Sequence, residues 1–237
     1  MKKIRLYAFP FAGGTATAYN SWKKYINESI EFCQVELSGR GRRIGTPFYK
    51  DIKEASDDVF DIIKSDIETS EYAFFGHSMG CLIAYELCLK IESLGLKRPK
   101  HVFLSGKKPP NIAKQSDEDI HMLPECEFIE EVKKFGGLPK EILEFKPLLD
   151  LFLPVIRADL KIVETYNCFD FNKKIHSDIT LLRGDKDNIT EEDMLRWSES
   201  TFGKCRLINF SGGHFFIYEH ENNVANIINQ TLLNYYE

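Results

Sequence analysis

One pentapeptide limits what this chain can fold into more than any other stretch. The sequence Gly-His-Ser-Met-Gly at 76–80 follows the apolar run 72–75 and precedes a run of helical character, 81–89. A serine between two glycines in that setting predicts a strand, a sharp turn that carries the serine, and a helix. The glycines leave room for neighbouring backbone, and the turn projects the hydroxyl clear of the sheet. We therefore expect Ser78 to be presented as a nucleophile.

The rest of the chain repeats this alternation of strands and helices. Short runs rich in β-branched and aromatic residues are separated by longer segments of helical period. This alternation is typical of an α/β fold, in which helices cover a mostly parallel sheet. The expected strands are 4–9, 33–37, 72–75, 101–105, 179–183 and 205–210. Among the expected helices, 57–67 carries one apolar stripe, and 82–94 is apolar enough for a central position.

The alternation lapses between about 112 and 176. Several helical segments separated by Pro and Gly take its place, and segment 148–162 is apolar on more than one side. A helix of that kind must bury two faces. We expect a single domain over 1–237 with an inserted helical lid at about 112–176. The lid either packs simply onto the core or presents an inner face to an acyl chain.

Composition argues against several classes of protein. The 237 residues are 43% hydrophobic, and 31 Lys and Arg against 36 Asp and Glu give a net charge of -5, so we expect no nucleic-acid partner. The apolar runs are far shorter than the roughly 20 residues of a membrane span. Arg5, Pro10 and Gly13 interrupt any signal-like start. We expect a soluble, cytoplasmic protein with no membrane partner.

The sequence predicts neither a metal nor a cofactor. The six cysteines are scattered without a C-x-x-C pair, which favours buried, reduced thiols over a zinc site. The glycine-rich segment 9–14 is followed by neither the dinucleotide spacing nor the Walker spacing. We therefore expect no bound nucleotide.

A serine hydroxyl needs a base to take its proton, and histidine, with a reference pKa of about 6.5, suits that task. Of the six histidines, His214 is the best placed, because it follows the last expected strand across the turn 211–213. The alternative is a histidine that serves only that turn. His77 lies inside the pentapeptide and is expected to point elsewhere.

The imidazole in turn needs an acid that holds it in one tautomer. The expected strand 179–183 runs into an acidic turn that contains Asp185 and Asp187. We choose Asp187, with Asp185 as the second candidate. The turn after the expected strand 101–105 contains no carboxylate. The chain order serine, aspartate, histidine, with each residue at a strand end, fits a hydrolytic triad.

Acyl transfer also needs N–H donors for the oxyanion that develops in the transition state. One expected donor is the Met79 N–H, directly after the serine and at the start of a helix. The second should come from the loop 9–14 after the first strand, where Ala12 is favoured over Phe11. The alternative for this loop is a plain glycine-rich turn.

Together these motifs resemble the α/β-hydrolase superfamily, and within it the type II (external) thioesterases that accompany nonribosomal peptide and polyketide synthases. Besides the pentapeptide, the resemblance rests on FPFAGG at 9–14, SGRGRR at 38–43, LPVIRAD at 153–159 and GGHFF at 212–216. It implies an α/β-hydrolase fold with Ser78, Asp187 and His214 as the triad. Where many relatives have Pro before Gly-Arg-Gly, this chain has Ser38. We expect that difference to change the loop and not the chemistry.

The resemblance also implies a substrate. It implies hydrolysis of acyl groups from the phosphopantetheine arm of carrier proteins, with no cofactor in the enzyme itself, and a role in removing misprimed or stalled acyl groups. Two basic clusters follow expected strands, Arg40 with Arg42 and Arg43, and Lys107 with Lys108. Both could contact an acidic acyl or peptidyl carrier protein at the active-site edge of the sheet, and solvated loop charge is the alternative.

Three other functions are compatible with the same residues. A small-molecule carboxylesterase or lipase would use the same triad on oxyesters. An acyltransferase would use it while excluding water. A binding module of the same fold would use none of this chemistry.

Overall fold

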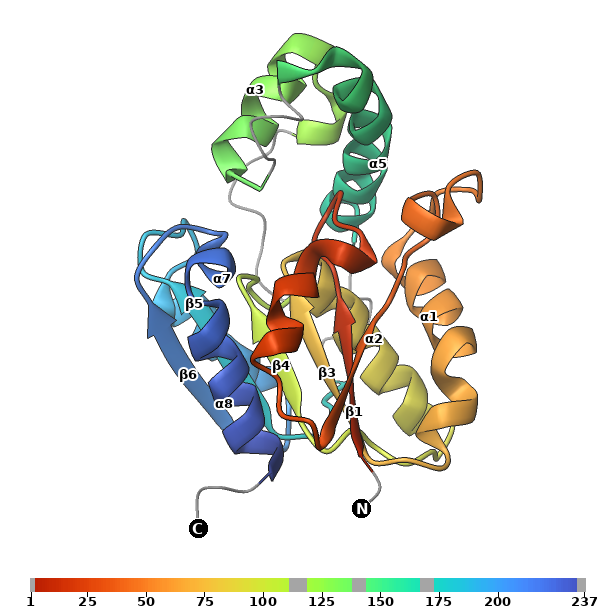
Figure 1. The fold of residues 1–237 in the computed structure, drawn as a ribbon, viewed down its shortest axis with the longest axis vertical. Helices are drawn as coiled ribbons and strands as arrows, with labels where there is room; N and C mark the ends of the chain where they lie inside the picture. The colour runs from red at the N-terminus through yellow and green to blue at the C-terminus, as the bar shows by residue number, and fades with distance from the viewer. Residues whose placement is uncertain (1–2, 111–118, 138–143, 167–172, 234–237) are drawn as a thin grey trace.

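Six parallel strands form the centre of the computed structural model, which describes residues 3–110, 119–137, 144–166 and 173–233. The strand order is β2-β1-β3-β4-β5-β6, and all five neighbouring pairs are parallel (Figure 1). The strands are β1 (Ile4–Phe9), β2 (Ile30–Gln34), β3 (Tyr72–His77), β4 (Val102–Ser105), β5 (Ile179–Gly184) and β6 (Cys205–Phe210). The expected α/β fold is confirmed.

The second strand departs from the expectation of 33–37. It pairs with β1 over 30–34, so that Ile4 lies opposite Ile30 and Ala8 opposite Gln34. Val35 and Leu37 are nevertheless buried, in the loop beyond the strand. The Val35 N–H still donates to the Ala8 carbonyl of β1 at 3.1 Å, just past the end of the strand. Apolar residues that stay buried beyond the strand explain why the sequence pattern placed the strand three residues too late.

Helices cover both faces of the sheet (Figure 1). The long helices α1 (Ile52–Ile67) and α2 (Met79–Ser93) pack on one face, and α8 (Glu221–Leu233) with the 3-10 segment η1 (Ala16–Lys24) covers the other. Neighbouring side chains of a strand point to opposite faces, so Phe74 packs in the first cluster and Phe75 in the second. The two faces together bury the core that the composition predicts.

Helix α1 begins five residues before the expected 57–67. The carboxylate of Asp51 accepts a hydrogen bond from the Glu54 N–H at 2.7 Å, which satisfies one of the unpaired donors of the first turn. The apolar stripe then buries Val59, Ile63 and Ile67 against the sheet. The cap, and not the stripe, sets where this helix starts.

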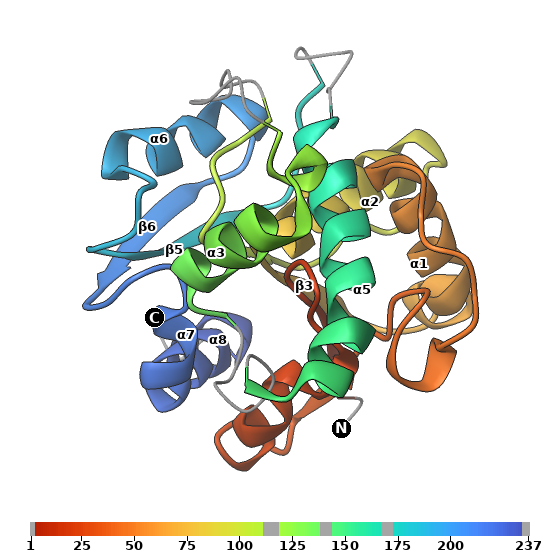
Figure 2. The ribbon, with the colours of Figure 1, turned by 90° about the horizontal axis from the view of Figure 1, so that it is seen from above.

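Two lid helices, α3 (Glu125–Phe135) and α5 (Lys146–Glu164), stand above the carboxyl edge of the sheet (Figures 1 and 2). They share a small core of Phe128, Val132, Leu153 and Ile156, whereas Ile162 of α5 belongs to the main core. Helix α5 thus buries two faces, as its apolar pattern requires. Residues 112–118, 138–143 and 167–172 of the expected insertion lie outside the described residues, and its bounds stay a prediction.

The remaining elements are short. They are η2 (Gly41–Arg43), η3 (Ile120–Met122), α6 (Glu191–Leu195), η4 (Arg196–Ser200) and α7 (Phe216–Glu219). Among the helices that the structure describes, none has the length and apolar character to cross a bilayer.

The expectation of buried, reduced thiols holds for the reduced state of the five described cysteines, but not all of them are buried. Cys81 and Cys88 are buried free thiols, and burial raises the pKa of Cys81 to about 12. Cys126 is a free thiol on the surface of the lid, and Cys168 lies outside the described residues.

The strand order places a topological switch point between β1 and β3. From β1 the chain runs to β2 on one side and later returns to β3 on the other, so the loops that follow β1 and β3 leave in opposite directions. In open parallel sheets, ligands bind at such a switch point, beyond the carboxyl ends of the strands. The loop 9–14 and the turn at Ser78 both begin at this point.

Candidate active site

Ser78 has a backbone conformation that side chains rarely allow. Its φ of 53° and ψ of -115° make it the one non-glycine residue with a positive φ in the described parts of the chain. Its N–H donates to the Ser105 carbonyl of β4 at 2.8 Å, and its carbonyl accepts from the Cys81 N–H at 3.0 Å. These bonds hold a strained turn between β3 and α2, which is the arrangement that presents a nucleophilic serine.

Gly76 and Gly80 are required by close backbone contacts. A Cβ atom on Gly76 would overlap the backbone of Gly80, and one on Gly80 would overlap the carbonyl of Phe9 at the end of β1. The serine turn therefore packs directly on the first strand, as the pentapeptide predicts. This contact brings the loop after β1 next to Ser78.

His214 and Asp187 meet at the carboxyl ends of β5 and β6. The Nδ1 atom of His214 lies 2.8 Å from one carboxylate oxygen of Asp187, and the other oxygen accepts from the Ile189 N–H at 3.4 Å. The Asp187 side chain is 6% exposed and that of His214 is 18% exposed. Because a carboxylate only accepts, Nδ1 carries the hydrogen, and Nε2 is left to exchange protons with a substrate or with Ser78.

Asp185, the second candidate for the acid, has a different task. Its carboxylate accepts from the Gly212 N–H at 2.9 Å, and the next residue, Lys186, donates its N–H to the Gly212 carbonyl at 2.9 Å. These two bonds join the turn after β5 to the turn that carries His214. Asp185 therefore fixes the position of the histidine loop, and Asp187 contacts the ring.

His77 packs against His214, with 5.0 Å between the ring centroids. Its Nδ1 atom lies 2.9 Å from the Ser105 hydroxyl. Burial, reinforced by the charge of the nearby His214, lowers the pKa of His77 well below its ordinary value. His77 therefore stays neutral, and no second positive charge opposes protonation of His214. Sequence reasoning set His77 aside as a base, which agrees with this position, but did not foresee its contact with His214.

The two expected oxyanion donors lie in the loop after β1 and at the start of α2. In the loop after β1, the Phe11 carbonyl accepts from the Gly14 N–H at 2.8 Å, and Gly13 has a φ of 80°. This turn resembles a type II turn, whose own hydrogen bond does not use the N–H of its second residue, Ala12. Met79 is the first residue of α2, and such a residue has no N–H acceptor within its helix. Both amides are thus suited to an outside acceptor.

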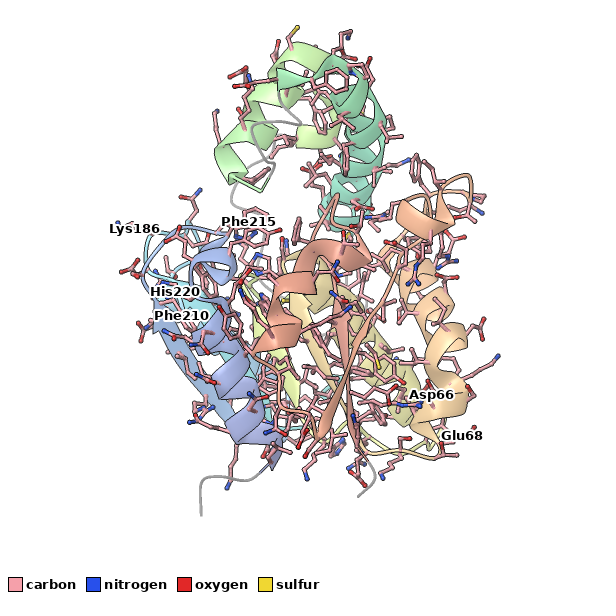
Figure 3. The ribbon with its side chains drawn as sticks, viewed as in Figure 1. Asp66, Glu68, Lys186, Phe210, Phe215 and His220 are labelled. Atoms are coloured by element: carbon pink, nitrogen blue, oxygen red, sulfur yellow. The ribbon has the colours of Figure 1, made fainter. Side chains whose placement is uncertain are left out.

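The end of α3 lies over the histidine. The ring of Phe135 is 6.5 Å from that of His214, and a Cβ atom on Gly137 would overlap the ring of Phe215. Phe215 lies at the upper edge of the sheet domain, facing the lid (Figure 3), and its ring is 4.8 Å from that of Phe11. The lid therefore contacts this edge of the sheet through Phe135 and Gly137.

Arg40 does not lie on a partner-facing surface, and that expectation is wrong for this residue. Its side chain is 3% exposed and forms a two-pronged ion pair with Asp159 of α5. Arg43 is half-buried and pairs with Asp58, whereas Arg42 is exposed. The sequence analysis did not predict this pair, although Asp159 lies between Ala158 and Leu160 in the apolar segment 148–162, and a buried aspartate needs a partner.

Lys107 and Lys108 are half-buried beyond the end of β4. The Lys107 carbonyl accepts from the Trp197 indole N–H at 2.6 Å, which fixes the backbone of this loop. The two lysines therefore lie at the catalytic edge of the sheet, as their position after a strand predicts.

One group of side chains in the described residues has the spacing of metal ligands. Ligand atoms of Asp119, His121 and Glu164 lie within 4.8 Å of one another in the lid. The Glu164 carboxylate already accepts from the Ile120 and His121 N–H groups, both at 3.1 Å, and contacts the His121 ring at 2.5 Å. These hydrogen bonds join η3 to α5, and this structural contact accounts for the cluster.

Known proteins match this chain along almost its whole length. The model of the thioesterase domain family matches residues 4–232. The gramicidin S biosynthesis protein GrsT of Aneurinibacillus migulanus is 33% identical over 92% of this chain and 84% of its own. The medium-chain S-acyl fatty acid synthase thioesterase of Rattus norvegicus is 33% identical over 97% and 88%. The structure of ClbQ from the colibactin NRPS/PKS pathway has a TM-score of 0.92 at 33% identity and covers 98% of both chains.

The different contacts of the two aspartates give a direct test. Asp187→Asn should lower kcat on a p-nitrophenyl ester by roughly 10,000-fold, because the amide no longer fixes the required tautomer of His214. Asp185→Asn keeps an oxygen that accepts from the Gly212 N–H, so its loss should be under about tenfold. Both variants are first compared with the wild type in urea unfolding. A larger loss for Asp185→Asn would show that the acid is assigned to the wrong residue.

Proposed function

The chain belongs to the thioesterase family, and we propose that it hydrolyses acyl thioesters held on the phosphopantetheine arm of acyl or peptidyl carrier proteins. One observation carries the proposal: the Asp187 carboxylate lies 2.8 Å from Nδ1 of His214 at the same sheet edge as the strained Ser78. GrsT is named for gramicidin S biosynthesis, and ClbQ comes from the colibactin NRPS/PKS pathway. The similarity of this chain to both proteins supports this substrate class. The proposed role is removal of misprimed or stalled acyl groups.

The first half of the reaction forms an acyl-enzyme. Ser78 gives its hydroxyl proton to Nε2 of His214 while its oxygen attacks the thioester carbonyl carbon. The N–H groups of Met79 and Ala12 stabilise the oxyanion of the tetrahedral intermediate. The carbon–sulfur bond then breaks, and the pantetheine sulfur leaves as a thiol after taking the proton. A thiolate is already a good leaving group, so His214 has less acid work here than in an amidase.

The second half releases the acid. His214 takes a proton from water, the hydroxide oxygen attacks the acyl-serine carbonyl, and the ester bond to Ser78 breaks as the serine oxygen regains the proton. Asp187 stabilises the imidazolium in both halves. His77 is buried and neutral and packs against the His214 ring, so no positive charge on His77 opposes the imidazolium.

The lid supplies an apolar cover for the acyl group. Phe135 lies over His214, and Phe215 packs between the lid and the loop after β1. Aromatic side chains on both sides of the catalytic edge suit an apolar acyl chain better than a charged one. We assign the inner face of the lid to acyl-chain binding.

The carrier protein should approach the basic residues at the same edge. Arg42 is exposed beyond β2, and Lys107 and Lys108 follow β4. Complementary charge at an interface speeds association with an acidic partner and fixes its orientation. Arg40 and its buried partner take no part in this contact.

A substrate panel tests the proposed function. In single-turnover experiments, the wild type should release radiolabelled acetyl from an acetyl-phosphopantetheinyl carrier protein faster than it hydrolyses p-nitrophenyl acetate, and Ser78→Ala should do neither. Activity on the oxyester alone would instead support a carboxylesterase. Failure on both, in a protein that a serine-reactive reagent labels at Ser78, would favour an acyltransferase, and failure of labelling would favour a binding module.

Charge reversal tests the carrier contact. Arg42→Glu and the double variant Lys107→Glu/Lys108→Glu should raise KM for the carrier-bound substrate by roughly tenfold and leave KM for acetyl-pantetheine unchanged, because only the carrier is charged and large. Lys100→Glu is the matched control, since Lys100 is exposed and precedes β4 at the opposite edge. Equal changes on both substrates, or an equal effect of the control, would rule out this interface.

A further inference from the structure

Arg40 and Asp159 form a buried ion pair that the proposed mechanism does not use. Both side chains are 3% exposed. Nη1 of Arg40 lies 2.5 Å from one carboxylate oxygen of Asp159, and Nη2 lies 2.7 Å from the other. Burying two charges costs desolvation free energy, and an apolar pair of similar volume often gives the same stability or more. The groups that such a pair positions therefore explain its presence better than a gain in the free energy of unfolding does.

The ion pair holds the loop that carries Ala12. The Asp159 oxygen nearest to Nη1 also accepts from the Gly13 N–H at 2.7 Å. Arg40 donates from Nη1 to the Gly14 carbonyl at 3.3 Å and from Nε to the Ser38 carbonyl at 3.2 Å. Hydrogen bonds to ionised groups are stronger than neutral ones. Just after Ala12, the Gly13 N–H is therefore held by the Asp159 carboxylate and the Gly14 carbonyl by the Arg40 guanidinium.

The same helix also contacts the loop sterically. Ile156 lies one turn before Asp159 on α5, and a Cβ atom on Gly13 would lie 2.5 Å from its Cγ1 atom. Gly13 has a φ of 80°, so the position excludes other residues by conformation and by space. The loop can keep its shape only while α5 keeps its place above it.

We propose that Arg40 and Asp159 are positioning residues, which hold the Ala12 N–H at the oxyanion site and tie that site to helix α5 of the lid. This inference rests on the proposed function, because it takes the Ala12 N–H as an oxyanion donor. On one side of Ala12, the Phe11 carbonyl accepts the hydrogen bond of the turn. On the other side, the Gly13 N–H donates to the Asp159 carboxylate. A shift of the Gly13 peptide would therefore move the Ala12 N–H away from the oxyanion.

Two variants distinguish a positioning role of the ion pair from a contribution to the stability of the fold. Asp159→Asn keeps the shape of the side chain and removes its charge. Arg40→Met/Asp159→Leu replaces the ion pair with apolar side chains, a change that usually preserves folding, and it removes the acceptor for the Gly13 N–H. In the folded double variant, kcat on acetyl-pantetheine should fall between roughly 10- and 1,000-fold, while KM changes by less than about threefold.

A trifluoromethyl ketone analogue of the thioester gives the second readout. It adds to the serine oxygen to form a tetrahedral oxyanion, so its inhibition constant should rise by about the same factor as kcat falls. A residue that only stabilises the fold would not produce this match. The control is Asp66→Asn, which weakens an ion pair with Arg5 at the opposite edge of the sheet (Figure 3) and should leave both quantities unchanged.

The outcomes test the proposed function and the positioning role of the ion pair separately. If the wild type hydrolyses no thioester, the proposed function fails. If the wild type is active and the folded double variant keeps full kcat and full inhibitor affinity, the positioning role is wrong and the function stands. If Asp159→Asn does not fold, the double variant decides alone. Equal losses of kcat in Asp66→Asn would attribute the effect to general destabilisation and overturn the inference.

Discussion

The backbone contact between Gly80 and Phe9 is the constraint on which the rest of the site depends. Strands β1 and β3 are neighbours although β2 lies between them in sequence, so their carboxyl ends form the switch point of the sheet, where open parallel sheets bind ligands. Because Gly80 has no side chain, the serine turn packs on the carbonyl of Phe9. The first turn of α2 and the loop after β1 consequently lie side by side, which is the arrangement that the proposed nucleophile and its two backbone donors require.

Three neighbouring side chains set the surroundings of the His214 ring. Asp187 contacts the ring of His214, Asp185 holds the loop that carries it, and burial keeps His77 neutral behind it. Beside the loop that carries Ala12, Arg40 and Asp159 neutralise each other. Asp187, Asp185 and Asp159 thus each have a defined partner, as the proposed role of His214 in proton transfer requires.

Local sequence patterns predicted the parts of the site that depend on strand ends. The pentapeptide, the acidic turn after β5 and the histidine turn after β6 each follow a recognisable strand, so the residues of the proposed triad and their order could be read without a structure. The partner of Arg40 could not, because it lies 119 residues away and pairs with it only through tertiary folding. The bounds of β2 were misplaced for a different reason: the buried residues Val35 and Leu37 continue the apolar pattern beyond the end of the strand.

The covalent step through Ser78 is the central claim of this account. Its most direct test is rapid acid quenching of the enzyme with an acetyl-carrier protein, followed by mass spectrometry of the peptide that contains Ser78. We predict one acetyl group on Ser78 that appears as fast as the free pantetheine thiol and disappears at the rate of acetate release. Release of the thiol without an adduct on Ser78, or with the acetyl group on another residue, would contradict the mechanism.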